Sequence, residues 1–320
     1  MRLKCGAVAL VLSSPLCLHG RASRMSLRGA ARACGARAAA GEGAVYLVRH
    51  GQSTWNLAAK RWDLWTMFSQ VDHPLTAEGL KQAQDLRVRM REAKFLSDGT
   101  RVFSSPLARA VATTIAAVGL DRSIELLPAA REIAWPWCGP DSMGTHGKAA
   151  LMVKVLQSLQ DDTLQDQALD LVDASRLAGK WSGRESKQEM HARLRLLLSL
   201  VRPDGRHWQN SVLVCHSLLI QRLFKDFASE ALQKESPELL LRLRARKLQN
   251  CGVAKILLDT DNLISHADLV FGTKLVWIKQ AFEEVVFKIL DTPSLLQSTQ
   301  PLGNRQVDAA RQAPSEGCGC

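Results

Sequence analysis

The chain has 320 residues, 46% of them hydrophobic, so it can bury a substantial core, as one large α/β domain or one domain with a subdomain. Its formal net charge is +11, but residues 1–41 hold seven arginines and lysines and no acidic residue, which leaves +4 for the rest. That modest excess fits a pocket for an anion and gives little support to a nucleic-acid-binding surface.

Cysteine usage indicates free thiols. Three of the eight cysteines lie in residues 1–41, and the other five are Cys138, Cys215, Cys251, Cys318 and Cys320. Their number is odd, their spacing is irregular and no Cys-x-x-Cys pair occurs, which disfavours a disulfide framework and a structural zinc site and makes a reducing compartment the simpler assumption. Cys215 is expected to be a small buried hydrophobic residue in a strand.

Residues 1–42 have the composition of a targeting leader. They are rich in Ala, Arg and Ser and contain no acidic residue before Glu42, as in an organellar transit peptide. Arg2 and Lys4 also precede an apolar run, residues 7–18, that resembles a secretory signal and is too short to span a bilayer. The leader predicts a plastid or a mitochondrion, reached directly or through the secretory route. The alternative is a disordered extension on a cytoplasmic protein.

The other end, residues 291–320, is polar and rich in Pro, Gly, Gln and Ser, so we expect a disordered tail. Its last four residues begin with Gly317, where a prenylation box requires cysteine. A terminal Cys-x-Cys does resemble doubly prenylated tails, so lipidation of Cys318 and Cys320 stays an open alternative. We expect no stable membrane association.

Between leader and tail, residues 43–290 alternate short strands with helices, which predicts an α/β domain with a mainly parallel sheet. The first strand, 45–48, runs directly into Arg49-His50-Gly51. A helix with Thr76 as its N-cap follows the segment 57–71, and its apolar face packs on the sheet.

The segment 57–71 is expected to be irregular. It carries four large apolar side chains, either lining a substrate mouth or packing a loop onto the domain: Trp62, Trp65, Met67 and Phe68.

Further strands and helices continue the alternation. The predicted strands are 101–103, 124–127, 211–215, 253–258 and a stretch near 269–271. The predicted helices are 110–118, 218–227, a charged segment 237–247 and an amphipathic helix 274–290.

Between Glu132 and His216 the chain inserts a long helical stretch, about residues 137–200, with helices at 149–159 and 186–201. An insertion between two active-site strands is the natural place for a lid that sets specificity.

Four of these strand ends deliver residues suited to phosphate chemistry: Arg49 with His50, Arg109, Glu132 and His216. Each alone has an ordinary structural explanation. Because a parallel sheet brings its strand ends to one edge, together they predict a shared pocket. An arginine fits phosphate oxygens, and a neutral histidine can attack phosphorus.

The chain resembles the histidine phosphatase superfamily, which includes cofactor-dependent phosphoglycerate mutases. The matching segments span about residues 44–258. In order they are Arg49-His50-Gly51 with Ser53 and Asn56, Pro74-Leu75-Thr76 with Gly79 and Gln82-Ala83, Ser105-Pro106-Leu107 with Arg109, Arg131-Glu132, Glu185-Ser186, and Val214-Cys215-His216-Ser217. The resemblance implies a three-layer α/β/α sandwich with a helical insertion or lid, and a catalytic domain at residues 43–290.

The resemblance also implies a role for each site residue. His50 would be the nucleophile, with its other ring nitrogen held by a backbone carbonyl. Arg49, Arg109 and His216 would neutralise the phosphoryl oxygens, and Asn56 and the backbone N–H of Ser217 would add hydrogen bonds. Glu132 would protonate the leaving oxygen and then activate water. Neither a metal nor another cofactor is needed.

Two departures bear on the substrate. Mutases of this family hold phosphoglycerate with a Phe-x-Gly-Trp-type and a Tyr-Gly-containing segment, where this chain has residues 61–65 and 134–138, each with two tryptophans. We therefore expect a metal-independent phosphomonoesterase acting on a small phosphorylated substrate or a phosphoprotein, with no nucleic-acid partner. The alternatives are a phosphoglycerate mutase-type enzyme and a catalytically silent phosphate-binding or interaction module.

Overall fold

The computed structural model describes residues 43–119, 121–133, 144, 147–159, 165–177, 185–205, 208–272 and 275–276. All of them belong to one compact unit, residues 41–320. The leader, the tail and the opening of the insertion at residues 135–140 lie outside the described residues.

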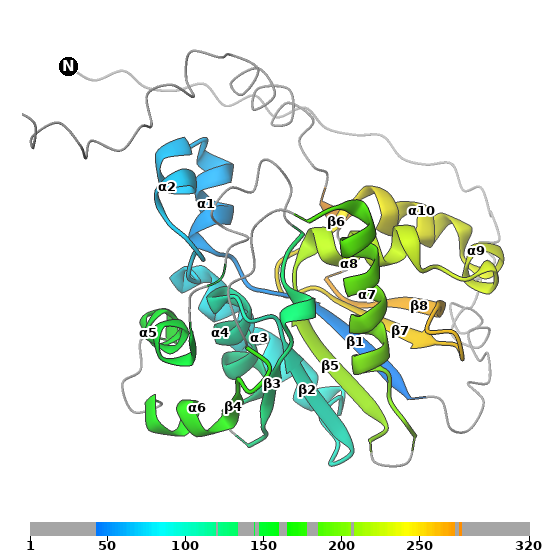
Figure 1. The fold of residues 1–320 in the computed structure, drawn as a ribbon, viewed down its shortest axis with the longest axis horizontal. Coiled ribbons are helices and arrows are strands. Elements are labelled where there is room, and N and C mark those ends of the chain that lie inside the picture. Colours follow the sequence, from blue (N-terminus) through cyan, green and yellow to red (C-terminus); the bar gives the residue numbers. More distant parts are fainter. Residues whose placement is uncertain are drawn as a thin grey trace, which may run out of the picture. The chain divides into compact units, whose positions relative to one another are not determined.

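Seven strands of the described chain form one sheet, in the order β4-β3-β2-β5-β1-β7-β8 (Figure 1). Strands β4, β3, β2, β5 and β1 are parallel to one another. β7 pairs antiparallel with β1, and β8 pairs antiparallel with β7. The prediction of a mainly parallel sheet is thus confirmed. The strand bounds are β1 Ala44–Arg49, β2 Thr100–Ser104, β3 Ile124–Leu126, β4 Val172–Asp173, β5 Asn210–Cys215, β6 Lys247–Leu248, β7 Val253–Leu258, β8 Ile264–Phe271 and β9 Leu275–Val276.

Helices lie on both faces of this sheet, as Figure 1 shows. Their bounds are α1 Thr54–Arg61, α2 Leu64–Ser69, α3 Ala77–Glu92, α4 Ala108–Val118, the 3-10 turn η1 Pro128–Ala130, α5 Gly147–Leu159, α6 Gln165–Leu171, α7 Lys187–Val201, α8 Ser217–Asp226, α9 Glu230–Glu235 and α10 Pro237–Ala245.

Side chains that alternate along the central strands supply two separate cores. Leu47 and Leu213 pack into a cluster with α7 and α8, whereas Val48 and Val214 pack into a cluster with α3 and α4. This alternation is the period of a strand buried on both faces, and it confirms the three-layer α/β/α fold.

Both helices expected in the insertion are present and are built into the domain. α5 packs against α4, and α7 contributes fully buried Leu194 and Leu197 to the core beside β5. Within the described chain, no helix is long and apolar enough to cross a membrane.

The prediction that residues 57–71 are irregular is wrong, because two short helices occupy most of this segment. Ser53 caps α1 in a reciprocal capping box, and the Asp63 side chain accepts the backbone N–H of Thr66 at the start of α2. Met67 is fully buried, while Trp62, Trp65 and Phe68 are exposed. The caps, rather than the aromatic side chains, decide the local structure.

A second correction concerns the predicted helix 274–290. Leu275 and Val276 form strand β9, which pairs antiparallel with β6. Residues beyond 276 lie outside the described part of the chain. Cross-strand pairing with a segment far away in the sequence overrides the amphipathic pattern at these two positions.

The thiols that the structure describes agree with the sequence. Cys215 and Cys251 are free and buried. Burial raises the pKa of the Cys215 thiol far above its usual range and that of Cys251 to about 12, so both behave as small apolar groups.

Two glycines allow the start of α3 to touch the segment that follows β1. A Cβ on Gly79 would lie 2.0 Å from the Gln52 carbonyl oxygen, and one on Gly51 would lie 2.4 Å from the Gly79 carbonyl oxygen. The Thr76 backbone N–H donates to the Gln52 carbonyl at 2.9 Å, which holds the two segments together. This contact fixes the backbone directly after His50.

We expect Gly79→Ala to destabilise the protein by about 2 kcal/mol, because the added methyl group overpacks this contact. The effect opposes helix propensity, which favours alanine over glycine by about 1 kcal/mol. Denaturant unfolding measures the change. Exposed Lys81 of the same helix provides the control, since Lys81→Ala is expected to change stability by at most about 0.5 kcal/mol. A Gly79→Ala protein as stable as the parent would contradict the close approach.

Candidate active site

His50 and His216 are neighbours because β1 and β5 are adjacent parallel strands. The register pairs Arg49 with Cys215, and the His50 backbone N–H donates to the Cys215 carbonyl at 3.0 Å. The two buried imidazole rings have centroids 5.1 Å apart. Both rings therefore stand at the carboxyl edge of the sheet, as the strand-end argument predicts.

The tautomer of His50 follows from its hydrogen bonds. Its Nδ1 lies 2.6 Å from the Gly51 carbonyl oxygen, which only accepts, so Nδ1 carries the proton. The Arg109 Nε–H donates to Nε2 at 3.3 Å. Nε2 thus keeps its lone pair, which is the state a nucleophile needs.

The charge state of His50 follows from its surroundings. Burial lowers its pKa well below the usual value, and the positive charges of Arg109 and Arg49 lower it further. His50 is therefore neutral at physiological pH.

Arg109 is held by a buried carboxylate that the sequence argument missed. Asp72 Oδ1 accepts the Ala108 backbone N–H at 2.8 Å and lies 3.9 Å from Arg109 Nη1. Asp72 has a positive φ of 54°, a conformation that aspartate tolerates better than most residues. It precedes the Pro74-Leu75-Thr76 segment, and that position is the one signal that could have identified it.

His216 presents one free ring nitrogen. Its Nε2 lies 2.7 Å from the Ser105 hydroxyl oxygen, while its buried Nδ1 has no hydrogen-bond partner among the described residues. Burial and the neighbouring charges of Arg109, His50 and Arg49 lower the pKa of His216 well below its usual value. Because the Ser105 hydroxyl oxygen already accepts the Leu107 N–H at 3.4 Å, we assign its own proton to His216 Nε2, which leaves Nδ1–H to donate to an anion.

Arg49 also has an unsatisfied donor. Its Nη1 donates to the Leu248 carbonyl at 2.6 Å, but its buried Nε has no partner within the described chain. Burial lowers the pKa of Arg49 to about 10, and the charge of Glu132 opposes that shift. The guanidinium therefore remains cationic at neutral pH. Arg49 and His216 each carry a buried donor that an anion would satisfy.

Glu132 lies at the N-terminus of α8. Its Oε1 accepts the backbone N–H groups of Ile133 and Leu219, each at 3.0 Å, and Oε2 lies 3.4 Å from the Leu218 nitrogen. Burial raises the pKa of this carboxyl, and the two N–H bonds and the charges of Arg109 and Lys247 oppose the rise. A carboxyl with a raised pKa holds its proton to a higher pH than an ordinary glutamate, so it can deliver that proton and, as the carboxylate, take one up again.

A buried ion cluster positions the turn that carries Glu132. The Glu185 carboxylate pairs with Arg193 and, at 3.0 Å, with Arg131. Arg193 Nη1 also donates to the carbonyls of Ala129 at 2.8 Å and Arg131 at 3.1 Å. Glu185 and Arg131 lie in segments that match the family pattern, but the sequence did not identify Arg193 as their common partner.

Asn56 and Ser217, the remaining predicted site residues, lie at helix starts. Asn56 Oδ1 accepts from Ser53 N and from Asn250 Nδ2, both at 3.2 Å, so its carbonyl is occupied and its amide N–H₂ is left for a ligand. Ser217 follows His216 as the first residue of α8, where backbone N–H groups favour anions.

Two further residues that the sequence did not identify hold the segment around His50. Asn250 Nδ2 donates to the His50 carbonyl at 3.1 Å. The Thr113 hydroxyl accepts the Gly51 N–H at 3.0 Å and donates to the Arg109 carbonyl at 2.7 Å. Neither is marked by a local motif, because each acts through a contact far away in the sequence.

The structure thus brings His50, His216, Arg49 and Arg109 together, with Glu132 beside them at the same sheet edge. This arrangement can bind a tetrahedral oxyanion and offer it a neutral imidazole. Over the described ranges, no group of three His, Cys, Asp or Glu side chains is placed to hold a metal ion.

The sequence of this chain matches that of a known protein family. The model of the histidine phosphatase superfamily, branch 1, matches residues 45–263. The probable phosphoglycerate mutase GpmB of Salmonella choleraesuis is 28% identical over 219 residues, which cover 66% of this chain and 83% of that protein.

The solved structures that match this chain are more distant in sequence. Phosphoserine phosphatase from Entamoeba histolytica is 21% identical, with a TM-score of 0.40 over 74% of this chain and 98% of its own. A mycobacterial glucosyl-3-phosphoglycerate phosphatase is 22% identical, with a TM-score of 0.43 over 71% of this chain and 98% of its own.

The family match covers more than half of the chain and includes every residue of the site described above. The chain therefore belongs to the histidine phosphatase superfamily, branch 1.

Proposed function

We propose that this protein is a metal-independent phosphomonoester hydrolase that acts through a phosphohistidine on His50. Its superfamily consists of phosphatases and mutases, which makes the chain a phosphoryl-transfer enzyme. The observation that carries the proposal is the geometry of His50: its Nδ1 lies 2.6 Å from the Gly51 carbonyl oxygen, so its Nε2, beside Arg109, keeps the lone pair.

In the first step, the Nε2 lone pair attacks phosphorus, and the bond from phosphorus to the ester oxygen breaks. Glu132 gives its proton to the leaving oxygen. Arg49, Arg109 and His216 stabilise the charge on the remaining phosphoryl oxygens, assisted by Asn56 and the Ser217 backbone N–H.

In the second step, the Glu132 carboxylate takes a proton from water, whose oxygen attacks phosphorus. The phosphorus–nitrogen bond breaks, and its electron pair returns to Nε2. The product is inorganic phosphate, and Glu132 and His50 regain their starting states.

A phosphoglycerate mutase-type reaction is the second candidate. The name of the Salmonella relative favours it. Two segments of the chain disfavour the mutase reaction. Residues 61–65 do not match the mutase pattern, and Trp62 and Trp65 there are 41% and 83% exposed. Residues 134–138, the other departure from that pattern, lie outside the described residues.

We expect His50→Ala to abolish turnover of para-nitrophenyl phosphate and the acid-labile, base-stable phosphoryl adduct on the protein. The reason is that the variant lacks the His50 Nε2 lone pair that attacks phosphorus. His266→Ala, in strand β8, is the matched control and should keep both. Chelator should leave turnover intact. Chelator-sensitive activity without a phosphohistidine would instead mean metal-assisted attack by water.

Glu132→Gln should separate the two steps. With an alkyl phosphate, kcat/KM should fall about 10²–10⁴-fold, because the poor leaving group needs the proton. With para-nitrophenyl phosphate, kcat/KM should fall far less, while kcat drops and the phosphohistidine persists longer. For the parent enzyme on an alkyl ester, kcat/KM should decline as pH rises through the raised pKa of Glu132. Equal losses for both esters would remove Glu132 as the acid.

With 3-phosphoglycerate as substrate, we expect no efficient conversion to 2-phosphoglycerate. A mutase must shield its phosphohistidine from water, whereas a hydrolase must admit water beside Glu132. Nuclear magnetic resonance of phosphorus distinguishes isomerisation from phosphate release. Rapid isomerisation stimulated by 2,3-bisphosphoglycerate would establish the mutase instead.

A further inference from the structure

A groove lies between α7 and α8. It has a volume of about 950 Å³ and is lined by ten residues: Lys187, Gln188, His191, Ala192, Arg195, Leu196, Ser199, Arg222, Asp226 and Asn262. None of them belongs to the catalytic machinery described above.

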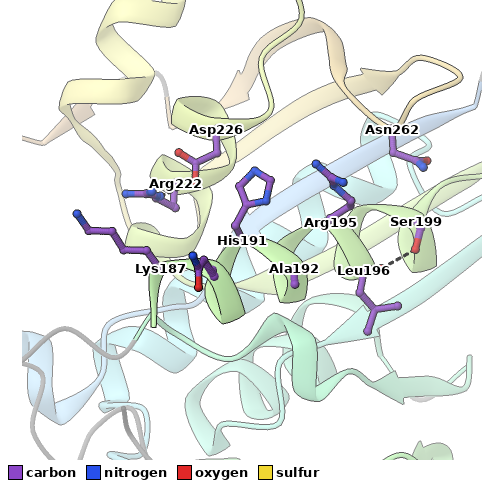
Figure 2. A pocket seen from close by; sticks show the side chains of 10 residues that line it. Lys187, His191, Ala192, Arg195, Leu196, Ser199, Arg222, Asp226 and Asn262 are labelled. Atoms are coloured by element: carbon purple, nitrogen blue, oxygen red, sulfur yellow. Dashed lines mark hydrogen bonds and ion pairs between the residues drawn. The ribbon is translucent and has the colours of Figure 1, made fainter. Parts of the chain in front are cut away.

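Three cationic side chains line this groove: Lys187, Arg195 and Arg222. Figure 2 shows Lys187, His191 and Arg195 on α7, facing Arg222 and Asp226 on α8. The spacing of four residues places the first three along one stripe of the helix. Asp226 is the one carboxylate in the lining, and it pairs with Arg222 at 2.6 Å. The groove therefore has an excess of positive charge.

Two of these cations are unpaired. Lys187 and Arg195 are exposed, and neither forms a hydrogen bond or ion pair with the part of the chain that the structure describes. The ring of His191 is stacked on Phe227, with centroids 4.7 Å apart, and forms part of the wall. The charge of Lys187 and Arg195 is thus available to a ligand.

The spacing of Lys187 and Arg195 suits an extended ligand. Lys187 and Arg195 are eight residues apart, about 12 Å along the helix axis. An extended peptide advances about 3.3 Å per residue, so carboxylates four residues apart on one side of it match this separation.

We propose that the α7–α8 groove docks an acidic, extended segment of a protein partner. Gln188, Ser199 and Asn262 add polar groups that suit a peptide backbone. A nucleic acid strand fits the groove less well, because no aromatic side chain in the lining is free to stack on bases.

The test uses a fluorescein-labelled hexaglutamate peptide and the full chain, with fluorescence anisotropy at low ionic strength. We expect saturable binding with one site, weakened by added salt. The double variant Lys187→Glu with Arg195→Glu should weaken binding at least tenfold, and the corresponding double glutamine variant should weaken it less.

The matched control reverses two exposed charges on α3, at the other face of the sheet: Lys81→Glu with Arg91→Glu. It changes the net charge equally and should alter binding by less than twofold. Turnover of para-nitrophenyl phosphate should be unchanged in all three variants, which would show that they fold. This control does not depend on knowing the natural substrate. Absence of hexaglutamate binding, equal loss in the control, or tighter binding of a labelled six-nucleotide single strand would each overturn the proposal.

Discussion

The pairing of β1 with β5 is the constraint on which the site depends. Because these parallel strands are in register, Arg49 lies beside Cys215, and the histidine that follows each strand reaches the same point at the sheet edge. The bond from the His50 N–H to the Cys215 carbonyl continues the ladder one residue past the strand. A shift of one residue would turn every side chain of β1 to the opposite face, so the packing of Leu47 and Val48 into different cores also fixes the position of His50.

Burial of positive charge follows from this arrangement. Arg49 and Arg109 are almost fully buried beside two histidines, and their charges help to keep both imidazoles neutral. Burying such groups costs free energy unless their donors are satisfied, yet Arg49 Nε and His216 Nδ1 lack partners among the described residues. A bound phosphoryl group would satisfy these donors and offset the charge. The free-energy cost of leaving them unpaired in the free protein therefore favours binding of an oxyanion.

Most of the ties that orient the site come from outside its own segments. Asp72 caps α4 and holds Arg109, Asn250 joins the His50 backbone to Asn56, and Glu185 with Arg193 holds the turn before Glu132. These contacts are charged or polar and buried or partly buried, so removing one partner leaves the other without its hydrogen bond or ion pair, at a cost in stability. Such a layer limits rotation of the reacting groups, and phosphoryl transfer depends chiefly on positioning and electrostatics.

The sequence alone determined the alternation of strands and helices, the residues at the four strand ends and the cap of α3, because these follow from local periodicity and capping. It also determined the set His50, His216, Arg49, Arg109 and Glu132, since a parallel sheet brings strand ends to one edge. Only the tertiary structure decided that Leu275 pairs as a strand, that Asp72 and Asn250 support the site, and that α7 and α8 form a cationic groove. The neutral state of His50 was also decided only by the tertiary structure. Each of these results depends on contacts between segments distant in sequence, and burial, pKa and pairing are properties of those contacts rather than of any local pattern.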